Sequence, residues 1–293
     1  MKTLEIPKKS GGTRTIYIQG PKEKHNYRYK GYQLAEFYER HGTDSAHGFR
    51  SGKSPVSNAA QHLNKKYSLT LDLKDFFDTI TPTHLTYAGV AEKLANDVCY
   101  KGSIKQGLSS SPPAANCAAI PLDKLILHEM KGLGDNKMGN VGDNEIIYTR
   151  YADDLTFSSN NLSLLLILRN KIPELVKICG FEVNNKKTRI QSANFGRRII
   201  TGIAIDDKIH PRRKHKRILR AALYNMKKLQ SLLSFLIFTN QLMSFALILE
   251  INRKQISKFI GLKEWCKLKT PTKNLNGKLV RVAVQVRTAQ AFK

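Results

Sequence analysis

The feature that most constrains this chain is the run Tyr-Ala-Asp-Asp at residues 151–154, which lies between two short apolar segments. The flanking residues 146–149 and 155–157 have β-strand composition, so the run predicts a strand, a tight turn and a second strand. Neighbouring side chains on a strand point to opposite faces, whereas at a turn Asp153 and Asp154 can both approach one cation. Two buried carboxylates this close repel each other unless a metal ion or a proton neutralises them. A solvent-exposed Asp-Asp turn without a metal ion is the simpler alternative. A metal site requires at least one further carboxylate from elsewhere in the chain.

A third carboxylate ends another predicted strand. Residues 67–73 alternate, with Leu69 and Leu71 on one face and Asp72 on the other. In-line attack on an α-phosphate builds charge on the attacking and leaving oxygens, and two Mg²⁺ ions about 3.5–4 Å apart stabilise both. Hard cations prefer carboxylate oxygens, and one aspartate cannot hold two ions. Asp72, with the pair at the turn, therefore predicts a nucleotidyl transferase site for two Mg²⁺ ions, with Mn²⁺ as a substitute.

Five strings, in chain order, carry a resemblance to a known family. Residues 151–154 resemble the catalytic box of reverse transcriptases, and residues 106–112 (Gln-Gly-Leu-Ser-Ser-Ser-Pro) resemble their Gln-Gly-x-x-x-Ser-Pro motif. Residues 58–62 resemble the Asn-Ala-x-x-His box of bacterial retron reverse transcriptases, and residues 200–202 their Val-Thr-Gly box, with Ile in place of Val. Residues 185–188 resemble the lysine-bearing motif after the catalytic hairpin. The chain is thereby similar to the retron reverse transcriptases.

The resemblance implies an α+β fold with right-hand polymerase architecture, in which the palm is ferredoxin-like and the thumb is helical. Periodicity alone predicts only α+β. The expected domains are fingers at 1–66 with further finger elements within 85–130, a palm with the catalytic hairpin at 67–208, a helical thumb at 209–262, and a basic C-terminal extension at 263–293. Valines alternate with polar residues and alanine across residues 279–287, which predicts a strand there. That strand could extend the core, bind RNA or dock a partner.

The implied activity is that of an RNA-directed DNA polymerase. A retron enzyme copies part of a structured noncoding RNA into RNA-linked single-stranded DNA (msDNA) from dNTPs, primed by a 2′-hydroxyl of the RNA, and acts in anti-phage defence with a separate effector protein. A group II intron-like or other bacterial reverse transcriptase is one alternative. A catalytically silent RNA-binding protein of the same fold is another, although the intact carboxylates and Gln-Gly argue against it.

The resemblance also assigns roles around the metal site. Asp72, Asp153 and Asp154 are expected to be catalytic and to bind the metal ions, and the backbone carbonyl of Leu73 adds a ligand. Lys187 resembles the lysine that protonates the leaving pyrophosphate, with an ordinary surface lysine as the alternative.

Further residues are expected to bind the nucleotide. Arg14, with Lys9 or its neighbour, resembles the finger residues that grip the triphosphate. Gln106 and Gly107 line the site, because glycine lets the backbone approach the substrate. Phe77, five residues after Asp72, resembles the aromatic that excludes a ribose 2′-hydroxyl; a core aromatic is the alternative.

Residues expected to contact the primer or the RNA form two groups. Asn58 and His62 belong to the retron box, and His62 has a structural or an RNA-contacting role. Thr201 and Gly202 resemble the strand that holds the primer terminus. A basic run without acids is expected to track phosphates, although such a run can also be a solvated face. Its members are Arg212, Arg213, Lys214, Lys216 and Arg217.

Charge supports a polyanionic partner. The chain of 293 residues carries 49 Lys+Arg against 23 Asp+Glu, a net charge of +26, which favours nucleic acid. Four well-separated cysteines without a Cys-x-x-Cys pair and an N-terminus without an apolar leader favour a reduced, cytoplasmic protein. Residues 232–251 are apolar enough to need comparison with a membrane span, but their interspersed polar residues favour two packed helices and no membrane partner.

Overall fold

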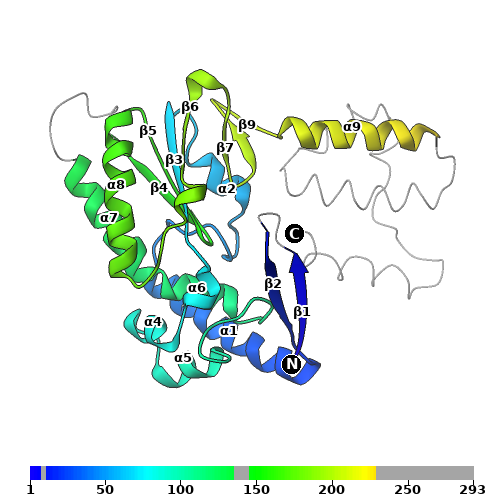
Figure 1. Ribbon diagram of the computed structural model, residues 1–293, viewed down its shortest axis with the longest axis vertical. Coiled ribbons are helices and arrows are strands. Elements are labelled where there is room, and N and C mark those ends of the chain that lie inside the picture. The colour runs from blue at the N-terminus through cyan, green and yellow to red at the C-terminus, as the bar shows by residue number, and fades with distance from the viewer. Residues whose placement is uncertain (8–10, 135–144, 229–293) are drawn as a thin grey trace. The chain divides into compact units, whose positions relative to one another are not determined.

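The computed structural model describes residues 1–7, 11–134 and 145–228 (Figure 1). The chain divides into two units, Met1–His210 and Pro211–Lys293, and each is described by itself. The predicted thumb helices within 232–251 and the predicted strand at 279–287 lie outside the described residues.

The first unit is built around a four-stranded antiparallel sheet in the order β4-β5-β3-β6. Its strands are β3 (Tyr67–Asp72), β4 (Ile147–Tyr151), β5 (Asp154–Ser159) and β6 (Arg189–Ser192). The predicted strand ending at Asp72 and the predicted hairpin around residues 151–154 are thus confirmed. Apart from half-buried Tyr67 and Asp154, the central strands β3 and β5 are buried along their whole length.

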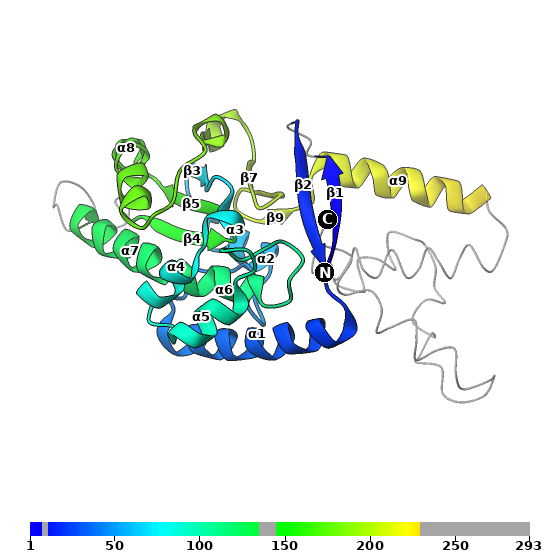
Figure 2. The same ribbon diagram turned by 60° about the horizontal axis from the view of Figure 1, so that its bottom comes forward.

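Helices cover both faces of this sheet. α7 (Ile120–Gly134) and α8 (Leu162–Ile178) lie on one face, and the short α2 (Pro55–Ala60) lies on the other (Figures 1 and 2). α8 begins where the Asn161 side chain accepts a hydrogen bond from Ser163 N. Its buried side chains recur every three or four residues, which places one apolar stripe against the sheet. The combination of an antiparallel sheet and packed helices confirms the α+β class.

A helical layer lies below the sheet, as Figure 2 shows. Its elements are α1 (Pro21–His41), α4 (Pro82–Tyr87), α5 (Glu92–Val98) and α6 (Ser111–Ala118), and the short α3 (Phe76–Thr79) follows β3. α1 packs against α6, and a Cβ at Gly31 would lie 3.1 Å from Ser109 O. Glycine at this position therefore lets the two segments approach closely.

Two small sheets complete the unit. A hairpin joins β1 (Lys2–Pro7) to β2 (Thr13–Ile18), and a three-stranded sheet contains β7 (Arg198–Ile200), β8 (Ile203–Ile205) and β9 (Ile209–His210). Two 3₁₀ turns, η1 (Asn185–Lys187) and η2 (Ala193–Phe195), flank β6.

The structure corrects the expectation that Thr201 and Gly202 lie within a strand. They form the two-residue turn between β7 and β8, with φ of +46° and +80°. Tight β-hairpins favour two consecutive left-handed residues, and glycine adopts that conformation without strain.

Little of the second unit is described. α9 (Arg213–Lys228) begins with basic side chains, and Arg213, Lys214, Lys216 and Arg217 are exposed, as is Arg212 before it. In the described part of the chain, no helix combines the length and apolar character needed to cross a bilayer. The described cysteines, Cys99, Cys117 and Cys179, are free thiols.

Candidate active site

The sheet brings the three predicted catalytic aspartates to one edge. Asp72, the last residue of β3, is the register partner of Asp154, the first residue of β5. Leu73 N donates a 2.9 Å hydrogen bond to Asp153 O, which ties the exit of β3 to the hairpin turn. Ala152 makes that turn tight by adopting φ +56°. Residues that are 82 positions apart along the chain therefore meet at one end of the sheet.

The backbone of Leu73 also faces this turn. On one side, Leu73 lies opposite Val183, and the hydrogen bonds of that bridge are made by the residues next to these two in the chain. The N–H of Leu73 itself points to the other side, toward Asp153. The N–H and C=O of one strand residue point the same way, so the Leu73 carbonyl is directed to the side of the aspartates.

Electrostatics at this edge favour a bound cation. Burial, together with the charges of Asp153 and Asp72, raises the pKa of Asp154 to about 7. Burial likewise raises the pKa of Asp153, and Asp72 adds to the effect, while Lys187 and Arg14 oppose it. Because of burial and mutual repulsion, ionisation of these carboxylates costs free energy unless a cation compensates the charge. Grouped carboxylate oxygens with excess negative charge fit Mg²⁺ or Mn²⁺, which prefer such ligands.

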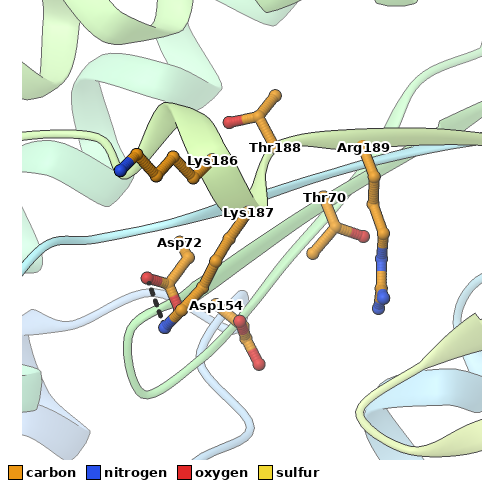
Figure 3. Close-up of a pocket in the computed structure, with 7 residues that line it drawn as sticks. All are labelled: Thr70, Asp72, Asp154, Lys186, Lys187, Thr188 and Arg189. Carbon is orange, nitrogen blue, oxygen red and sulfur yellow. Dashed lines mark hydrogen bonds and ion pairs between the residues drawn. The ribbon is translucent and has the colours of Figure 1, made fainter. Parts of the chain in front are cut away.

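A pocket of about 340 Å³ opens beside the aspartates (Figure 3). Its lining consists of Thr70, Asp72, Asp154, Lys186, Lys187, Thr188 and Arg189. Lys187, from η1, places Nζ 2.8 and 2.9 Å from the two carboxylate oxygens of Asp72. This hydrogen bond to Asp72 raises the pKa of Lys187, because it stabilises the ammonium form. The structure thus places Lys187 within the site, and its neighbour Lys186 makes no such contact in the figure.

Gln106 and Gly107 contact the β1–β2 hairpin. Tyr17 N, on β2, donates a 2.8 Å hydrogen bond to Gln106 O. Gly107 has φ +99°, and a Cβ there would lie 2.3 Å from Tyr17 O. The close approach that requires glycine is therefore made by the backbone of β2.

Arg14 belongs to the same strand and lowers the pKa of Asp153, which places its charge near the aspartates. Lys9 lies outside the described residues.

Phe77 lies on α3, just after β3. Its ring meets Phe49 and Phe76 edge-on, with centroid distances of 6.0 Å to each and interplanar angles of 72° and 76°. Phe76 is buried in the core, whereas Phe77 is half-buried. The more accessible of the two rings is therefore the one at the spacing expected of the sugar-selecting aromatic.

The segments around the two retron-type strings pack against each other, because α2 contacts β7 and β8. Thr201 donates a hydrogen bond from Oγ1 to Pro55 O at 3.0 Å, and Arg198 donates from Nη2 to His62 O at 2.9 Å. Asn58 and His62 are fully buried. This burial favours the structural role for His62, because neither side chain reaches the surface where RNA could bind.

His62 links two strands of the sheet. Its Nδ1 and Nε2 atoms each lie 2.7 Å from a hydroxyl, of Ser158 on β5 and of Thr149 on β4. Burial, with the charges of Arg198 and His47, lowers the pKa of His62 to about 3. The imidazole is therefore neutral and fixed in place.

Two features, a buried ion pair and a cluster of possible metal ligands, were predicted from the sequence only in part or not at all. Arg150 is fully buried and forms an ion pair with Asp123 at 2.8 Å. The available signal was Asp123, an acid in the first turn of α7 next to Leu122. Asp206, Asp207 and His210 also place ligand atoms within 4.8 Å of one another among the described residues. Asp206 is already bound to Arg197 and His210.

Comparison with known proteins finds a matching family and several relatives. Residues 6–218 match the family described as reverse transcriptase (RNA-dependent DNA polymerase). The retron Mx65 reverse transcriptase of Myxococcus xanthus is 29% identical over 76% of this chain, and the retron Ec86 reverse transcriptase of Escherichia coli is 30% identical over 61%. The alignments cover 55% of each relative, so the chain spans about half of their length. A solved structure of Candida Tropicalis telomerase with a telomeric RNA fragment superposes with a TM-score of 0.49 at 17% identity, over 71% of this chain and 44% of that one.

The match to the family extends from β1 into α9 and includes all three aspartates. The right-hand polymerase fold follows from it, and the resemblance to retron enzymes that the motifs predict is confirmed by the named relatives. The chain belongs to the reverse transcriptase (RNA-dependent DNA polymerase) family, and its resemblance is to the bacterial retron members.

Proposed function

We propose that this protein is an RNA-directed DNA polymerase of the retron type. The observation that carries the proposal is the register of the sheet, which pairs Asp72 with Asp154, together with the hydrogen bond from Leu73 to Asp153. A protein that used this fold only to bind RNA would have no need to crowd three carboxylates at a partly buried edge, where charge repulsion costs stability.

Asp72, Asp153, Asp154 and the Leu73 carbonyl would hold two Mg²⁺ ions, and Mn²⁺ could replace them. Bound there, the ions supply stabilisation of the charge that develops on the attacking and leaving oxygens. The chain's own contribution is to keep these ligands together on rigid strands, so that little reorganisation is needed when substrate arrives.

Lys187 is proposed to donate a proton to the leaving pyrophosphate. The hydrogen bond to Asp72 raises the pKa of Lys187 and so holds the proton on Nζ for as long as that contact lasts. The ion pair with Asp72 holds the ammonium group of Lys187 next to the carboxylates. Because Asp72 cannot serve the lysine and a cation equally, cation binding should release Lys187 toward the phosphates.

The nucleotide is proposed to bind between the β1–β2 hairpin, which would belong to the fingers, and the end of the sheet that carries the aspartates. Arg14, with Lys9, would hold the triphosphate, and Gln106 and Gly107 would fix the position of β2 through its backbone contacts. Phe77 would present its ring to the sugar and leave no space for a 2′-hydroxyl.

A polyanionic template explains the net charge of +26. The exposed basic residues from Arg212 to Arg217 would follow RNA phosphates, so binding should weaken steeply with salt. The finer parts of the proposal are copying of a structured noncoding RNA into msDNA, priming from an RNA 2′-hydroxyl, a cytoplasmic location, and anti-phage action with a separate effector. Their support is the resemblance to retron enzymes.

A cellular experiment tests the proposal. The gene would be expressed with its flanking DNA, and nucleic acid would be extracted from wild type and from Asp153→Ala/Asp154→Ala. The expected result is a discrete RNA-linked single-stranded DNA, sensitive to a debranching enzyme, in wild type alone. The same DNA in the double variant would refute the catalytic assignment, and DNA insensitive to debranching would refute the 2′-hydroxyl primer.

A further inference from the structure

Phe49 combines exposure with an unfavourable backbone conformation. Its side chain is 43% exposed and its φ is +60°, in the left-handed region that bulky residues rarely adopt. Such a conformation persists only where the surroundings enforce it, and it concentrates at functional sites. A side chain this exposed gains too little from burial to explain why the residue is phenylalanine.

The segment before Phe49 is fixed to the catalytic hairpin. His47 N donates a 2.8 Å hydrogen bond to Arg150 O on β4. Gly48 O accepts one from Asn116 Nδ2 at 2.9 Å. A Cβ at Gly48 would lie 2.6 Å from Ala152 N, so the loop backbone lies directly against the turn that carries the aspartates.

The residue after Phe49 is fixed as well. Arg50 forms a two-pronged ion pair with Glu39, at 3.0 and 2.7 Å, and donates to Thr43 O at 3.1 Å. Its guanidinium lies 5.3 Å from the centre of the Tyr38 ring, and its side chain is only 12% exposed. With both neighbours anchored, the direction of the Phe49 side chain is set by the fold.

That direction is toward Phe77. The two rings meet edge-on at 6.0 Å and 72°, and Phe76 contacts Phe77 in a similar way. Phe77 lies on α3, a helix of only four residues, which by itself constrains a side chain weakly. Exclusion of one extra hydroxyl depends on where the blocking ring lies, because a ring that can rotate away leaves room for the oxygen.

We propose that Phe49 is a positioning residue that holds the Phe77 ring against the sugar site and thereby sets the preference for deoxyribonucleotides over ribonucleotides. The inference rests on the proposed polymerase function and on Phe77 as its sugar-selecting aromatic. Under this proposal two rings take part in selecting the sugar. Phe77 faces the sugar, and Phe49, from the loop packed on the turn with the aspartates, supports Phe77.

Single-nucleotide incorporation tests this role. The full chain would extend a DNA primer annealed to an RNA template with dCTP or with CTP. The measured quantity is the kcat/KM for dCTP divided by the kcat/KM for CTP, called the ratio below. Phe49→Ala should lower the ratio by about 3- to 10-fold, the range that one lost ring pair can supply. The fall should come from faster use of CTP. Phe49→Tyr keeps the ring and should keep the ratio.

A second variant separates positioning from loop stability. Phe49→Gly removes the ring but relieves the left-handed backbone, so its thermal midpoint should equal or exceed that of Phe49→Ala. The ratio should nevertheless fall as far as in Phe49→Ala. The control is Phe195→Ala, which removes a ring that is 96% exposed on η2 and should change neither quantity.

The outcomes distinguish the inference from its foundation. In a Phe77→Ala background, Phe49→Ala should lower the ratio no further, because the ring that it holds is gone. A wild-type ratio in both Phe49→Ala and Phe49→Gly, with a lowered ratio in Phe77→Ala, would overturn the positioning role alone. An unchanged ratio in Phe77→Ala would overturn the sugar-selecting role and the inference with it, and failure of wild type to incorporate dCTP would overturn the polymerase proposal itself.

Discussion

Arg150→Met should destabilise the protein by removing one half of a buried ion pair between β4 and α7. Arg150 Nε lies 2.9 and 3.1 Å from the two carboxylate oxygens of Asp123, and Nη2 lies 2.8 Å from one of them. Both side chains are 0% exposed. Methionine leaves the Asp123 carboxylate buried with the hydroxyl of Tyr148, at 2.7 Å, as its remaining contact in this network.

The expected loss follows from burial. Removing one partner of a buried pair costs about 3–5 kcal/mol, because a charge stays behind without compensation. Arg150→Met should therefore lower the free energy of unfolding by that amount. Adding Asp123→Leu removes the stranded carboxylate and should recover part of the loss, although the Tyr148 hydroxyl then loses its acceptor at a cost of about 1–3 kcal/mol.

Urea unfolding followed by circular dichroism measures both changes. The matched control is Arg197→Met, which breaks a pair with Asp206 in which the arginine is 49% exposed, and should cost less than about 1 kcal/mol. The reasoning would be refuted if Arg150→Met cost no more than this control, or if the double variant were less stable than Arg150→Met. Arg150 Nη1 also donates to Ala152 O at 3.3 Å, so the double variant should remain a slower polymerase than wild type.

Three further predictions concern the surroundings of the aspartates. Gly107→Ala should destabilise the fold by about 1–3 kcal/mol through its left-handed backbone alone, and more through the clash with Tyr17 O; an unchanged urea midpoint would contradict this. Burial lowers the pKa of His62 to about 3 from 6.5, so the unfolded chain binds a proton first and stability falls as pH drops below 6.5. At pH 5 the loss is about 2 kcal/mol, and His62→Gln should flatten this part of a urea-unfolding pH series, whereas equal slopes would argue against a buried neutral imidazole. Lys187→Met should free Asp72 and lower the half-saturating Mg²⁺ concentration by up to about five-fold, because a half-exposed ion pair contributes at most about 1 kcal/mol. A thermal-shift titration without nucleotide measures this concentration, and weaker Mg²⁺ binding would contradict the competition between Lys187 and the cation.

The sequence predicted the parts of the fold that depend on local pattern. Alternation over residues 67–73 and the two short runs around residues 151–154 were enough for the strands and the hairpin, because strand period and turn chemistry are local. The resemblance then suggested that Asp72 and the hairpin meet, and the register shows how they do.

Long-range packing was beyond the sequence. Nothing local indicates that Asn58 and His62 are fully buried, or that His62 finds its two hydroxyl partners on strands far along the chain. Glycine at position 107 was expected to serve the substrate, but only the folded structure shows the backbone of β2 against it. The contact of Phe49 with Phe77 likewise joins a loop and a helix that share no pattern.

The most direct test of the central claim is metal-dependent incorporation of a dNTP by the purified chain. An RNA template with an annealed DNA primer would be extended by wild type, by Asp154→Asn and by Asp207→Asn, which makes the same change in the separate cluster with Asp206 and His210. Salt-sensitive binding of the same RNA would be measured for all three. The account predicts Mg²⁺-dependent extension by wild type and Asp207→Asn, none above background by Asp154→Asn, and similar RNA binding throughout. Extension by Asp154→Asn at the wild-type rate, or RNA binding by wild type without any extension, would contradict it.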